Sequence, residues 1–344
     1  NIMNRLSVII PMYNVEDYVE RCIRSLENQD IRHDEYEIIC INDGSPDDCK
    51  EVIRLLQKEF TNIVLVDQDN QGVSIARNNG ISIAGGKYLL MIDPDDYVAE
   101  NSLREVLEYA DKADLEVMYL GFAIHNHKGQ IVWQTDYSKA AGEVLGGVEG
   151  YYASRRNDTR DPDRSWAMLY RSDLIENYRI RYPENVPYLE DGLFLVKVFA
   201  TASATGFMDF VFYKRTIRPG SATNSSLFYS ERAVAGFITA ANDLKKFGND
   251  HEFSEKQKEL INHGIVNFVL LSLFPLIRAR SIMRFIKTVR KLEREGYKKI
   301  NTSGVAEPYL SYAKKYNKSP LFFAVSYWGN LARKKISTAI IPER

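Results

Sequence analysis

The sequence predicts an α/β fold with a mostly parallel sheet flanked by helices, followed by a helical C-terminal region. Three features of the sequence predict this fold. Short runs rich in Val and Ile alternate with helical patterns over residues 1–120. These runs are apolar throughout, as strands are when helices cover both faces of a parallel sheet. From about residue 227 onward only helical patterns occur.

The first 120 residues contain the predicted strands and the helices between them. Apolar residues recur at helical spacing between the strands, for example at Tyr18, Cys22 and Leu26. This spacing predicts helices that pack one face on the sheet. Five apolar runs are the predicted strands: residues 6–10, 36–41, 62–66, 87–92 and 115–120.

The next hundred residues are of mixed character. Residues 126–129 predict a turn between two short strands, and the charged segment 155–164 predicts a mobile loop. Helical patterns cover residues 166–178 and 191–202, and a strand-like run follows at residues 207–213.

The composition is that of an ordinary globular protein. The chain has 344 residues, of which 45% are hydrophobic and 26% charged, with a net charge of -1, so it can bury a sizeable core. The cysteines Cys22, Cys40 and Cys49 form no C-x-x-C pair, which argues against a disulfide framework or a zinc site and for a reducing compartment. The longest apolar stretch, residues 264–277, is shorter than the roughly 20 residues that span a bilayer. Because no signal-peptide pattern opens the chain, we expect a cytoplasmic protein.

Unusual residues follow each of the first four predicted strands. Parallel α/β sheets bind ligands at the carboxyl ends of their strands, so these residues are candidates for a binding site. They are Pro11, Tyr13 and Asn14 after the first strand, residues 42–45 after the second, residues 67–72 after the third and residues 93–96 after the fourth.

Three aspartates, Asp93, Asp95 and Asp96, directly follow the fourth strand. Mg²⁺ and similar hard cations prefer carboxylate oxygens, and Mg²⁺ usually keeps water and substrate phosphates in its shell. A D-x-D pair at a strand end can therefore offer one carboxylate to a metal and another to a sugar hydroxyl. The alternative is a polar turn before a helix that begins near Asn101.

Asp43, in the sequence INDGS, also has two interpretations. N-D-G is common turn chemistry, with Ser45 or Asp47 capping the next helix. The same turn can present the Asp43 carboxylate to an N–H group on the edge of a nucleobase. Tyr13 can cover the face of such a base or serve only in packing.

The segment DNQGVSIARNNGI, residues 69–81, carries Arg77 between Gly72 and Gly80. The forked guanidinium of Arg77 can pair with a phosphate, and an exposed helix charge is the alternative. Neither G-x-G-x-x-G nor G-x-x-x-x-G-K-[ST] occurs in the chain. Their absence argues against a dinucleotide oxidoreductase and a P-loop ATPase.

Glu190 and Asp191 precede the apolar pattern GLFLVKVFA. Acidic residues in the first turn of a helix interact favourably with its dipole, which is the structural interpretation. A carboxylate that faces a metal site can instead accept a proton from an attacking group.

Taken together, these motifs resemble the family 2 glycosyltransferases, which have the GT-A fold, and they occur in the order of that family. The tract YKRTIRPGSAT, residues 213–223, is also similar to the family. The matching motifs are SVIIPMYN (7–14), EIICINDGSPDD (37–48), NQGVSIARNNGI (70–81), YLLMIDPDD (88–96), WAMLYRSDLI (166–175) and LEDGLF (189–194).

The resemblance implies roles for individual residues. Asp95 would bind Mn²⁺ or Mg²⁺ bridging the diphosphate, and Asp191 would be the general base. Arg218 and Ser221 would lie on a flexible tract near the diphosphate. Pro94 stands where the family also has small or apolar residues, and it should rigidify the loop. The residues that would line the nucleotide pocket are Pro11, Tyr13, Asp43 and Arg77, with Asp93 at the ribose.

The resemblance also implies an activity and a division of the chain. The activity is inverting transfer of a sugar from a nucleotide-diphosphate sugar, most often a UDP-sugar, to a hydroxyl of a glycan or lipid-linked acceptor. Residues 1–224 would form the catalytic domain, with residues 1–120 binding the nucleotide and residues 121–224 the acceptor. Residues 225–344 would form a helical C-terminal region that matches no shared motif of the family.

Three other functions are weighed against this one. A sugar nucleotidyltransferase would carry a basic, glycine-rich loop after the first strand, whereas PMYNVEDYVERC is acidic and free of glycine. An inactive binding or scaffold protein with the same fold would be expected to lose Asp95 or Asp191, and both are present. Nucleic-acid binding would call for basic motifs interleaved with aromatic residues, which do not occur.

A basic amphipathic pattern marks the C-terminal region. Residues 277–299 contain nine cationic and two acidic residues, and the apolar residues Ile282, Phe285, Ile286, Val289 and Leu292 recur at helical spacing. A second basic cluster, Arg333 to Lys335, follows an aromatic run. Such helices can lie on anionic lipid, which predicts a peripheral position at the inner face of the cell membrane through residues 277–344. A helix packed by its apolar face onto the catalytic domain is the alternative.

Overall fold

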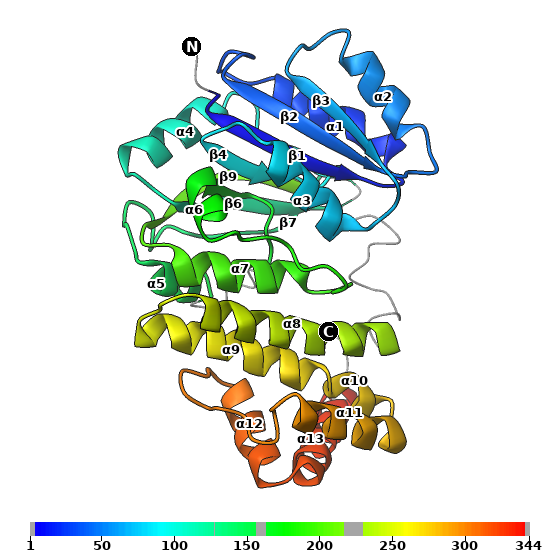
Figure 1. The fold of residues 1–344 in the computed structure, drawn as a ribbon. Coiled ribbons are helices and arrows are strands. Elements are labelled where there is room, and N and C mark those ends of the chain that lie inside the picture. Colours follow the sequence, from blue (N-terminus) through cyan, green and yellow to red (C-terminus); the bar gives the residue numbers. More distant parts are fainter. Residues whose placement is uncertain (1–3, 127, 156–162, 217–229, 341–344) are drawn as a thin grey trace. The chain divides into compact units, whose positions relative to one another are not determined.

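The computed structural model describes residues 4–126, 128–155, 163–216 and 230–340. The chain divides into two compact units, drawn in Figure 1. The first unit contains residues 1–184 and 194–224, and the second unit contains residues 185–193 and 225–344.

Among the described residues, nine strands of the first unit form one sheet in the order β3-β2-β1-β4-β8-β6-β9-β5, with β7 paired to β6. β3, β2, β1 and β4 are parallel, whereas β8 runs antiparallel to both β4 and β6. The predicted α/β class is confirmed, and the sheet is parallel in its first four strands and mixed beyond them. The strands are β1 Leu6–Met12, β2 Tyr36–Asp43, β3 Ile63–Gln68, β4 Tyr88–Met91, β5 Tyr97–Val98, β6 Val117–His125, β7 Ile131–Gln134, β8 Met168–Arg171 and β9 Thr205–Thr216.

Helices cover both faces of the parallel strands, as their apolar composition predicts. Side chains alternate between the faces of a strand, and Ile38 and Cys40 of β2 contribute to the core that contains α1 and α2. Ile39 and Ile41 face the opposite way and pack with α3. The helices of this part are α1 Glu16–Glu27, α2 Cys49–Leu56, α3 Val73–Ile83, α4 Leu103–Lys112, α5 Gly147–Ala153, α6 Ser172–Asn177 and α7 Glu190–Thr201.

The position of α3 depends on a glycine. A Cβ at Gly80 would lie 2.4 Å from Cγ2 of Ile9 in β1. Only a residue without a side chain therefore lets the helix lie this close to the strand. This close approach holds Arg77, three residues earlier on α3, near the ends of β1 and β4.

The prediction of a helix over residues 166–178 is wrong for its first half. Residues 168–171 form β8, and the helix begins only at Ser172. Both edges of β8 are paired, to β4 through Tyr88 opposite Arg171 and to β6 through Val117 opposite Tyr170. Hydrogen bonds on both sides and burial between two strands outweigh the local helical pattern.

The charged segment 155–164 ends in a core residue, Arg164. Residues 156–162 lie outside the described residues, but the side chain of Arg164 is 1% exposed. Its guanidinium donates to the carbonyl oxygens of Trp166 at 2.6 Å and Ala167 at 2.9 Å and to the hydroxyl of Tyr137 at 2.8 Å. A buried guanidinium needs such partners, and this one fixes the backbone that enters β8.

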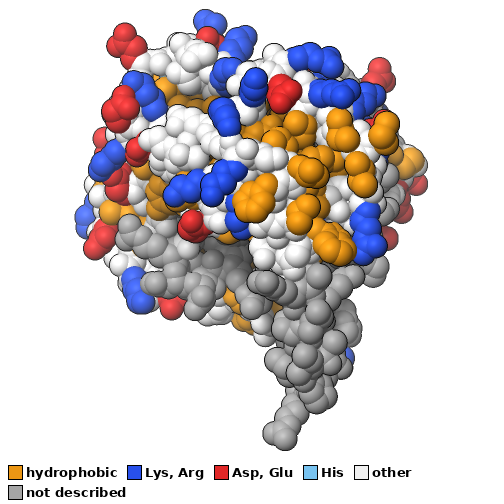
Figure 2. Space-filling model, turned by 90° about the horizontal axis from the view of Figure 1, so that it is seen from below, with side chains coloured by type: hydrophobic (Ala, Val, Ile, Leu, Met, Phe, Trp, Pro, Cys, Tyr) orange, Lys and Arg blue, Asp and Glu red, His pale blue; other side chains and the backbone are white. Residues whose placement is uncertain are grey.

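The second unit is helical in its described residues, as predicted. α8 and α9 begin at serine caps, because Ser230 accepts from the Ala233 N–H and Ser254 forms a capping box with Gln257. Several large apolar side chains of the last helices are exposed. Figure 2 shows the protein from below, with hydrophobic side chains gathered on that face and Lys and Arg side chains around them. The helices are α8 Glu231–Asp250, α9 Glu255–Leu271, α10 Phe274–Arg278, α11 Ile282–Arg294, α12 Tyr309–Lys318 and α13 Pro320–Ile340.

One stretch of the described residues, Glu255–Arg278, is long and apolar enough to cross a membrane by length and composition. It is longer than the apolar run 264–277, because the helical residues before that run are included. Since 78% of its most apolar window is buried within the protein, it has the burial of a core helix.

Candidate functional site

The carboxyl ends of β1 to β4 bring the predicted binding residues to one edge of the first unit. Pro11 is buried in β1 opposite Ile41 of β2. Tyr13 follows this strand with 51% of its surface exposed. The ring is therefore outside the hydrophobic core, which argues against the packing interpretation of Tyr13.

Hydrogen bonds join the loops that follow β1 and β2. The Asn14 N–H donates to Oγ of Ser45 at 2.7 Å, and the Glu16 N–H donates to Oδ2 of Asp47 at 2.7 Å. The Asp48 N–H donates back to Oε2 of Glu16 at 2.8 Å. The start of α1 is thus fastened to the loop before α2, which fixes the position of the residues around Tyr13.

Asp43 is buried and holds the loop that follows β3. Its Oδ1 accepts from the Gln71 N–H and from Nε2 of Gln68, both at 2.8 Å, and its Oδ2 accepts from the Gly72 N–H at 2.9 Å. Because a carboxylate has about four acceptor sites, these three bonds leave room for one further donor. The turn interpretation is therefore supported, and a contact with a nucleobase remains compatible with it.

Arg77 and Asp93, two residues predicted to lie at the nucleotide, form an ion pair. Nη2 of Arg77 lies 3.1 Å from Oδ1 of Asp93. Arg77 is 4% exposed, so the interpretation as an exposed helix charge is wrong. Its guanidinium also lies 5.1 Å from the centre of the Tyr182 ring, a cation–π contact.

The three aspartates after β4 have different environments. Asp96 is buried and accepts from the Tyr213 hydroxyl at 2.6 Å and from the Thr216 N–H at 2.8 Å. The Tyr213 oxygen in turn accepts from the Asp93 N–H at 3.2 Å. Asp96 thus joins the aspartate loop to the end of β9, while the Asp93 side chain is paired with Arg77.

Asp95 lies between these two anchored residues. Its backbone carbonyl accepts from Nη2 of Arg21 at 2.9 Å, and the same Nη2 donates to Oγ1 of Thr216 at 3.0 Å. The guanidinium of Arg21 lies 4.5 Å from the centre of the Tyr97 ring. The backbone of the aspartate loop is therefore held from α1, β5 and β9 at once.

Negative charge accumulates in this loop. Burial, with the charges of Asp95 and Asp93 as further causes, raises the pKa of the Asp96 carboxyl well above its usual range. Burial also raises the pKa of Asp93, with the Arg77 charge opposing this and the Asp95 charge adding to it. A nearby cation would relieve this repulsion, so the donor set fits a divalent metal.

The described residues contain no group of three or more His, Cys, Asp or Glu side chains that could hold a metal by themselves. A metal at this loop would therefore use one or two carboxylates and take its other ligands from a bound diphosphate and water. Mg²⁺ is usually held in this way in proteins.

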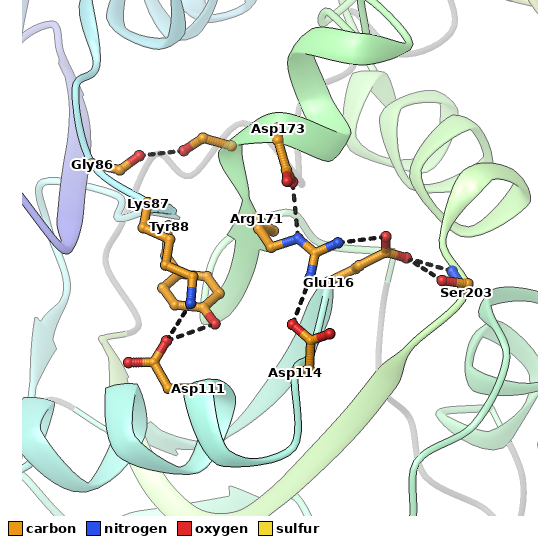
Figure 3. Close-up of polar contacts among 10 residues, drawn as sticks. Gly86, Lys87, Tyr88, Asp111, Asp114, Glu116, Arg171, Asp173 and Ser203 are labelled. Atoms are coloured by element: carbon orange, nitrogen blue, oxygen red, sulfur yellow. Dashed lines mark hydrogen bonds and ion pairs between the residues drawn. The ribbon is translucent and has the colours of Figure 1, made fainter.

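A second polar network lies at the opposite end of β4 (Figure 3). Arg171 donates to Asp173 at 2.8 Å, Asp114 at 3.0 Å and Glu116 at 2.8 Å. These contacts fasten the end of β8 to the start of β6. Because the network lies at the amino end of β4, away from the aspartate loop, its role is structural.

Asp191, Arg218 and Ser221 are the remaining predicted residues. Asp191 is half-buried in the first turn of α7, directly after Glu190. It belongs to the second unit, and its role as a base stays a prediction. Arg218 and Ser221 lie outside the described residues, so their place near a diphosphate also stays a prediction.

The residues that support the aspartate loop are not among those predicted from the sequence. Tyr213 is 117 residues from Asp96 in the sequence, and no local pattern links them. Trp166 stacks on the Tyr213 ring with 4.7 Å between ring centres. The sequence signal that could have revealed this support is the third aspartate of D-P-D-D. This residue, Asp96, is buried and accepts a hydrogen bond from Tyr213.

We expect Tyr213→Phe to lower both stability and turnover. The change leaves Asp96 and the Asp93 N–H without their shared partner, which should lower the free energy of unfolding by about 1–3 kcal/mol and loosen the loop. Tyr316→Phe is the matched control, because Tyr316 is equally buried and its hydroxyl donates to the Tyr297 carbonyl. Urea unfolding and the rate of nucleotide release should show a similar stability loss in both variants but a slower rate only for Tyr213→Phe. Equal rates in the two variants would contradict the supporting role.

Comparison with known sequences identifies relatives of the chain. The family model described as Glycosyl transferase family 2 matches residues 7–177. The chain is 32% identical to the uncharacterized glycosyltransferase EpsJ of Bacillus subtilis, over 63% of this chain and 62% of EpsJ. It is 26% identical to a poly(ribitol-phosphate) beta-glucosyltransferase of Bacillus spizizenii, over 70% of this chain and 38% of that protein. The chain thus spans less than two thirds of the length of either relative.

Comparison with solved structures agrees on the fold. A crystal structure of Staphylococcus aureus TarS in complex with UDP-GlcNAc matches with a TM-score of 0.71. The match covers 95% of this chain and 92% of that chain at 20% sequence identity. The first unit therefore has the GT-A arrangement, with a mixed sheet between helices.

Proposed function

Because the chain belongs to the family 2 glycosyltransferases, we propose that it transfers a sugar from a nucleotide-diphosphate sugar to an acceptor hydroxyl, with inversion at the anomeric carbon. The observation that carries this proposal is the aspartate loop at residues 93–96. It lies at the carboxyl edge of the parallel strands and is held there by Arg21, Arg77 and Tyr213.

The donor is proposed to be a UDP-sugar. The similar fold of TarS was crystallised with UDP-GlcNAc, which supports uridine as the nucleoside. Asp43 would accept from the base edge with its remaining acceptor site, and Pro11 and the exposed ring of Tyr13 would lie against the base. Asp93, oriented by the ion pair with Arg77, would accept from the ribose.

Asp95 is the residue proposed to hold Mn²⁺ or Mg²⁺, with Asp93 beside it. A divalent metal would offset charge on the departing diphosphate. The hydrogen bonds from Arg21 and the clasp between Asp96 and Tyr213 keep the Asp95 backbone in place. Such preorganisation is what electrostatic stabilisation of a leaving group requires.

Asp191 is proposed to be the general base. The acceptor hydroxyl must lose a proton as its oxygen attacks the anomeric carbon, and a carboxylate can take it in the transition state. Arg218 and Ser221 are proposed to approach the diphosphate. In this scheme residues 1–120 bind the donor and residues 121–224 contribute to binding the acceptor.

The acceptor is proposed to be a glycan or a lipid-linked glycan on the cytoplasmic side of the membrane. The relative from Bacillus spizizenii is named for glucosyl transfer to poly(ribitol-phosphate), which supports a polymeric acceptor. The cationic stretch 277–299 supports a peripheral position at the inner face of the membrane.

Donor binding separates this function from its rivals. Calorimetric titration with a UDP-sugar, with UTP and with a sugar phosphate should show metal-dependent binding of the UDP-sugar that chelation weakens. A sugar nucleotidyltransferase would instead prefer UTP and the sugar phosphate. An inactive binding protein would bind the UDP-sugar without releasing UDP, so the proposal fails if bound donor stays intact with every acceptor tested.

A further inference from the structure

We propose that the second unit docks on an anionic lipid bilayer through one face that surrounds an apolar groove between α11 and α13. We call this face of the second unit the docking face. The inference specifies the membrane contact proposed above, and it does not depend on the transfer reaction. The apolar members of the docking face are Ile282 and Ile286 of α11 and Leu321, Val325 and Trp328 of α13.

The groove has a volume of about 680 Å³ and is lined by side chains of α10, α11 and α13. Phe285 and Val289 form part of the lining and are buried. Leu321 and Val325 line it from α13. The groove is therefore mostly apolar, and covering its apolar side chains would remove them from water, which is favourable.

Large apolar side chains at the rim of the groove are unusually exposed. Ile282 is 70% exposed, Leu321 68%, Val325 62% and Trp328 45%. Figure 2 shows hydrophobic side chains gathered on one face of the protein, with Lys and Arg side chains around them. Contiguous apolar patches bordered by polar groups mark surfaces that contact another molecule or a membrane.

The outward stripe of α13 is not needed to pack that helix. Phe323 and Tyr327, on its other side, are buried and pack against Phe274. The Tyr327 ring stacks on that of Phe274, with 4.5 Å between the ring centres. Leu321, Val325 and Trp328 follow the spacing of a second helical stripe. The outward side of a surface helix normally carries polar residues. A second apolar stripe therefore indicates that the outward side of α13 contacts an apolar environment and not water.

Cations border the apolar surface. Arg280 and Arg290 line the groove, and the guanidinium of Arg280 lies 5.3 Å from the centre of the Trp328 ring. Lys287 and Lys291 are exposed on α11. Glu293 is the acidic residue that the groove lining contains. Lipid phosphates would meet these cations when the apolar side chains enter the region below the headgroups.

The same charges argue against a second copy of the chain as the occupant. In a two-fold symmetric dimer the docking face would contact itself. Arg280, Lys287 and Arg290 of both copies would then lie in one interface, and this accumulation of like charge is unfavourable. An anionic bilayer instead complements both the apolar groove and its cationic border.

Co-sedimentation of the full chain with lipid vesicles tests this proposal. The protein should bind vesicles that contain phosphatidylglycerol and not vesicles of phosphatidylcholine alone. Binding should weaken between 0.1 M and 1 M salt, because the Debye length falls from about 10 Å to about 3 Å. Binding should also shift tryptophan emission to shorter wavelength, and Trp328→Phe should remove most of this shift.

Two variants locate the contact on the docking face. Leu321→Ser with Val325→Ser should lower the partition coefficient by about 10-fold or more, since two apolar side chains no longer leave water. Lys287→Glu, Arg290→Glu and Lys291→Glu together should lower it by at least about 100-fold, since each cation near anionic lipid contributes about fivefold. Both variants alter exposed side chains and should fold normally.

The controls carry the same chemical changes in the first unit. Leu55→Ser with Val132→Ser replaces exposed apolar residues, and Lys58→Glu, Lys112→Glu and Lys139→Glu reverses exposed charges. Both controls should bind vesicles like the unchanged protein. The proposal is overturned if the unchanged protein ignores anionic vesicles, or if the controls lose binding as fully as the docking-face variants. It is also overturned by a dimer in solution that Leu321→Ser with Val325→Ser dissociates.

Calorimetric titration with a UDP-sugar separates this result from the proposed activity. Donor binding by the docking-face variants should equal that of the unchanged protein. Vesicle binding without donor binding would contradict the proposed function alone, and donor binding without vesicle binding would contradict the docking face alone.

Discussion

Replacing Asp95 with Ala is expected to remove metal-dependent turnover, with a loss of at least about 10²–10³-fold in the rate of nucleotide release. The reason is that Asp95 is the second aspartate of the D-x-D motif that follows β4. It is the residue proposed to hold the metal that would offset charge on the departing diphosphate. The fold should persist, because the hydrogen bond from Arg21 reaches the Asp95 backbone and not its side chain.

The measurement is the rate of nucleotide release as a function of Mn²⁺ and Mg²⁺ concentration, together with urea unfolding of each variant. Asp34→Ala is the control, since Asp34 is an exposed aspartate that precedes β2, at the opposite edge of the sheet. It should match the unchanged protein in both measurements. Full activity of Asp95→Ala, or full activity of the unchanged protein with a chelator, would show that Asp95 holds no catalytic metal.

Asp191→Asn is expected to keep donor binding and to slow transfer by about 10²–10⁴-fold. The amide keeps the size of the carboxyl group but cannot accept the proton of the acceptor hydroxyl. The comparison variant is Glu190→Gln, because both residues lie in the first turn of α7. The alternative is that both carboxylates only stabilise α7 through their interaction with the helix dipole. Each change should then lower the free energy of unfolding by about 0.3–1 kcal/mol, and neither should slow transfer.

Steady-state kinetics and donor titration on both variants separate the two roles. The base assignment predicts a lower kcat for Asp191→Asn with an unchanged dissociation constant for the donor. Glu190→Gln should show a rate close to that of the unchanged protein. Wild-type turnover in Asp191→Asn would remove Asp191 from the mechanism and leave only its place at the start of the helix.

The parallel part of the fold could be predicted from the sequence because its signals are local. The strands β1, β2 and β3 are apolar runs with helical spacing between them, and parallel strands bring their carboxyl ends to one edge. The strand β8 could not be predicted in this way. Residues 168–171 become a strand because β4 and β6 pair with them from both sides, and both partners are distant in the sequence.

The same distinction applies to the candidate site. D-P-D-D and the position of Arg77 on a helix after β3 are visible in the sequence, and the structure brings Arg77 and Asp93 into contact. The contacts that distinguish the three aspartates are not visible there. They come from Tyr213 and Thr216 at the end of β9, more than a hundred residues away. The role of Asp43 could not be predicted in full for a related reason. Its carboxylate accepts hydrogen bonds from the backbone N–H groups of Gln71 and Gly72, in addition to any contact with a ligand.

The most direct test of the central claim is the release of nucleoside diphosphate from a panel of sugar nucleotides by the purified chain. The panel should include UDP-, GDP- and TDP-sugars, with Mn²⁺ or Mg²⁺ and with glycan and lipid-linked acceptors. A glycosyltransferase that uses Asp95 and Asp191 should release nucleoside diphosphate from at least one donor, only with metal. Both Asp95→Ala and Asp191→Asn should slow this release by about 10²-fold or more. The account would be contradicted if folded protein that binds a sugar nucleotide released no diphosphate from any donor. Release at the same rate from the unchanged protein and from both variants would contradict it equally.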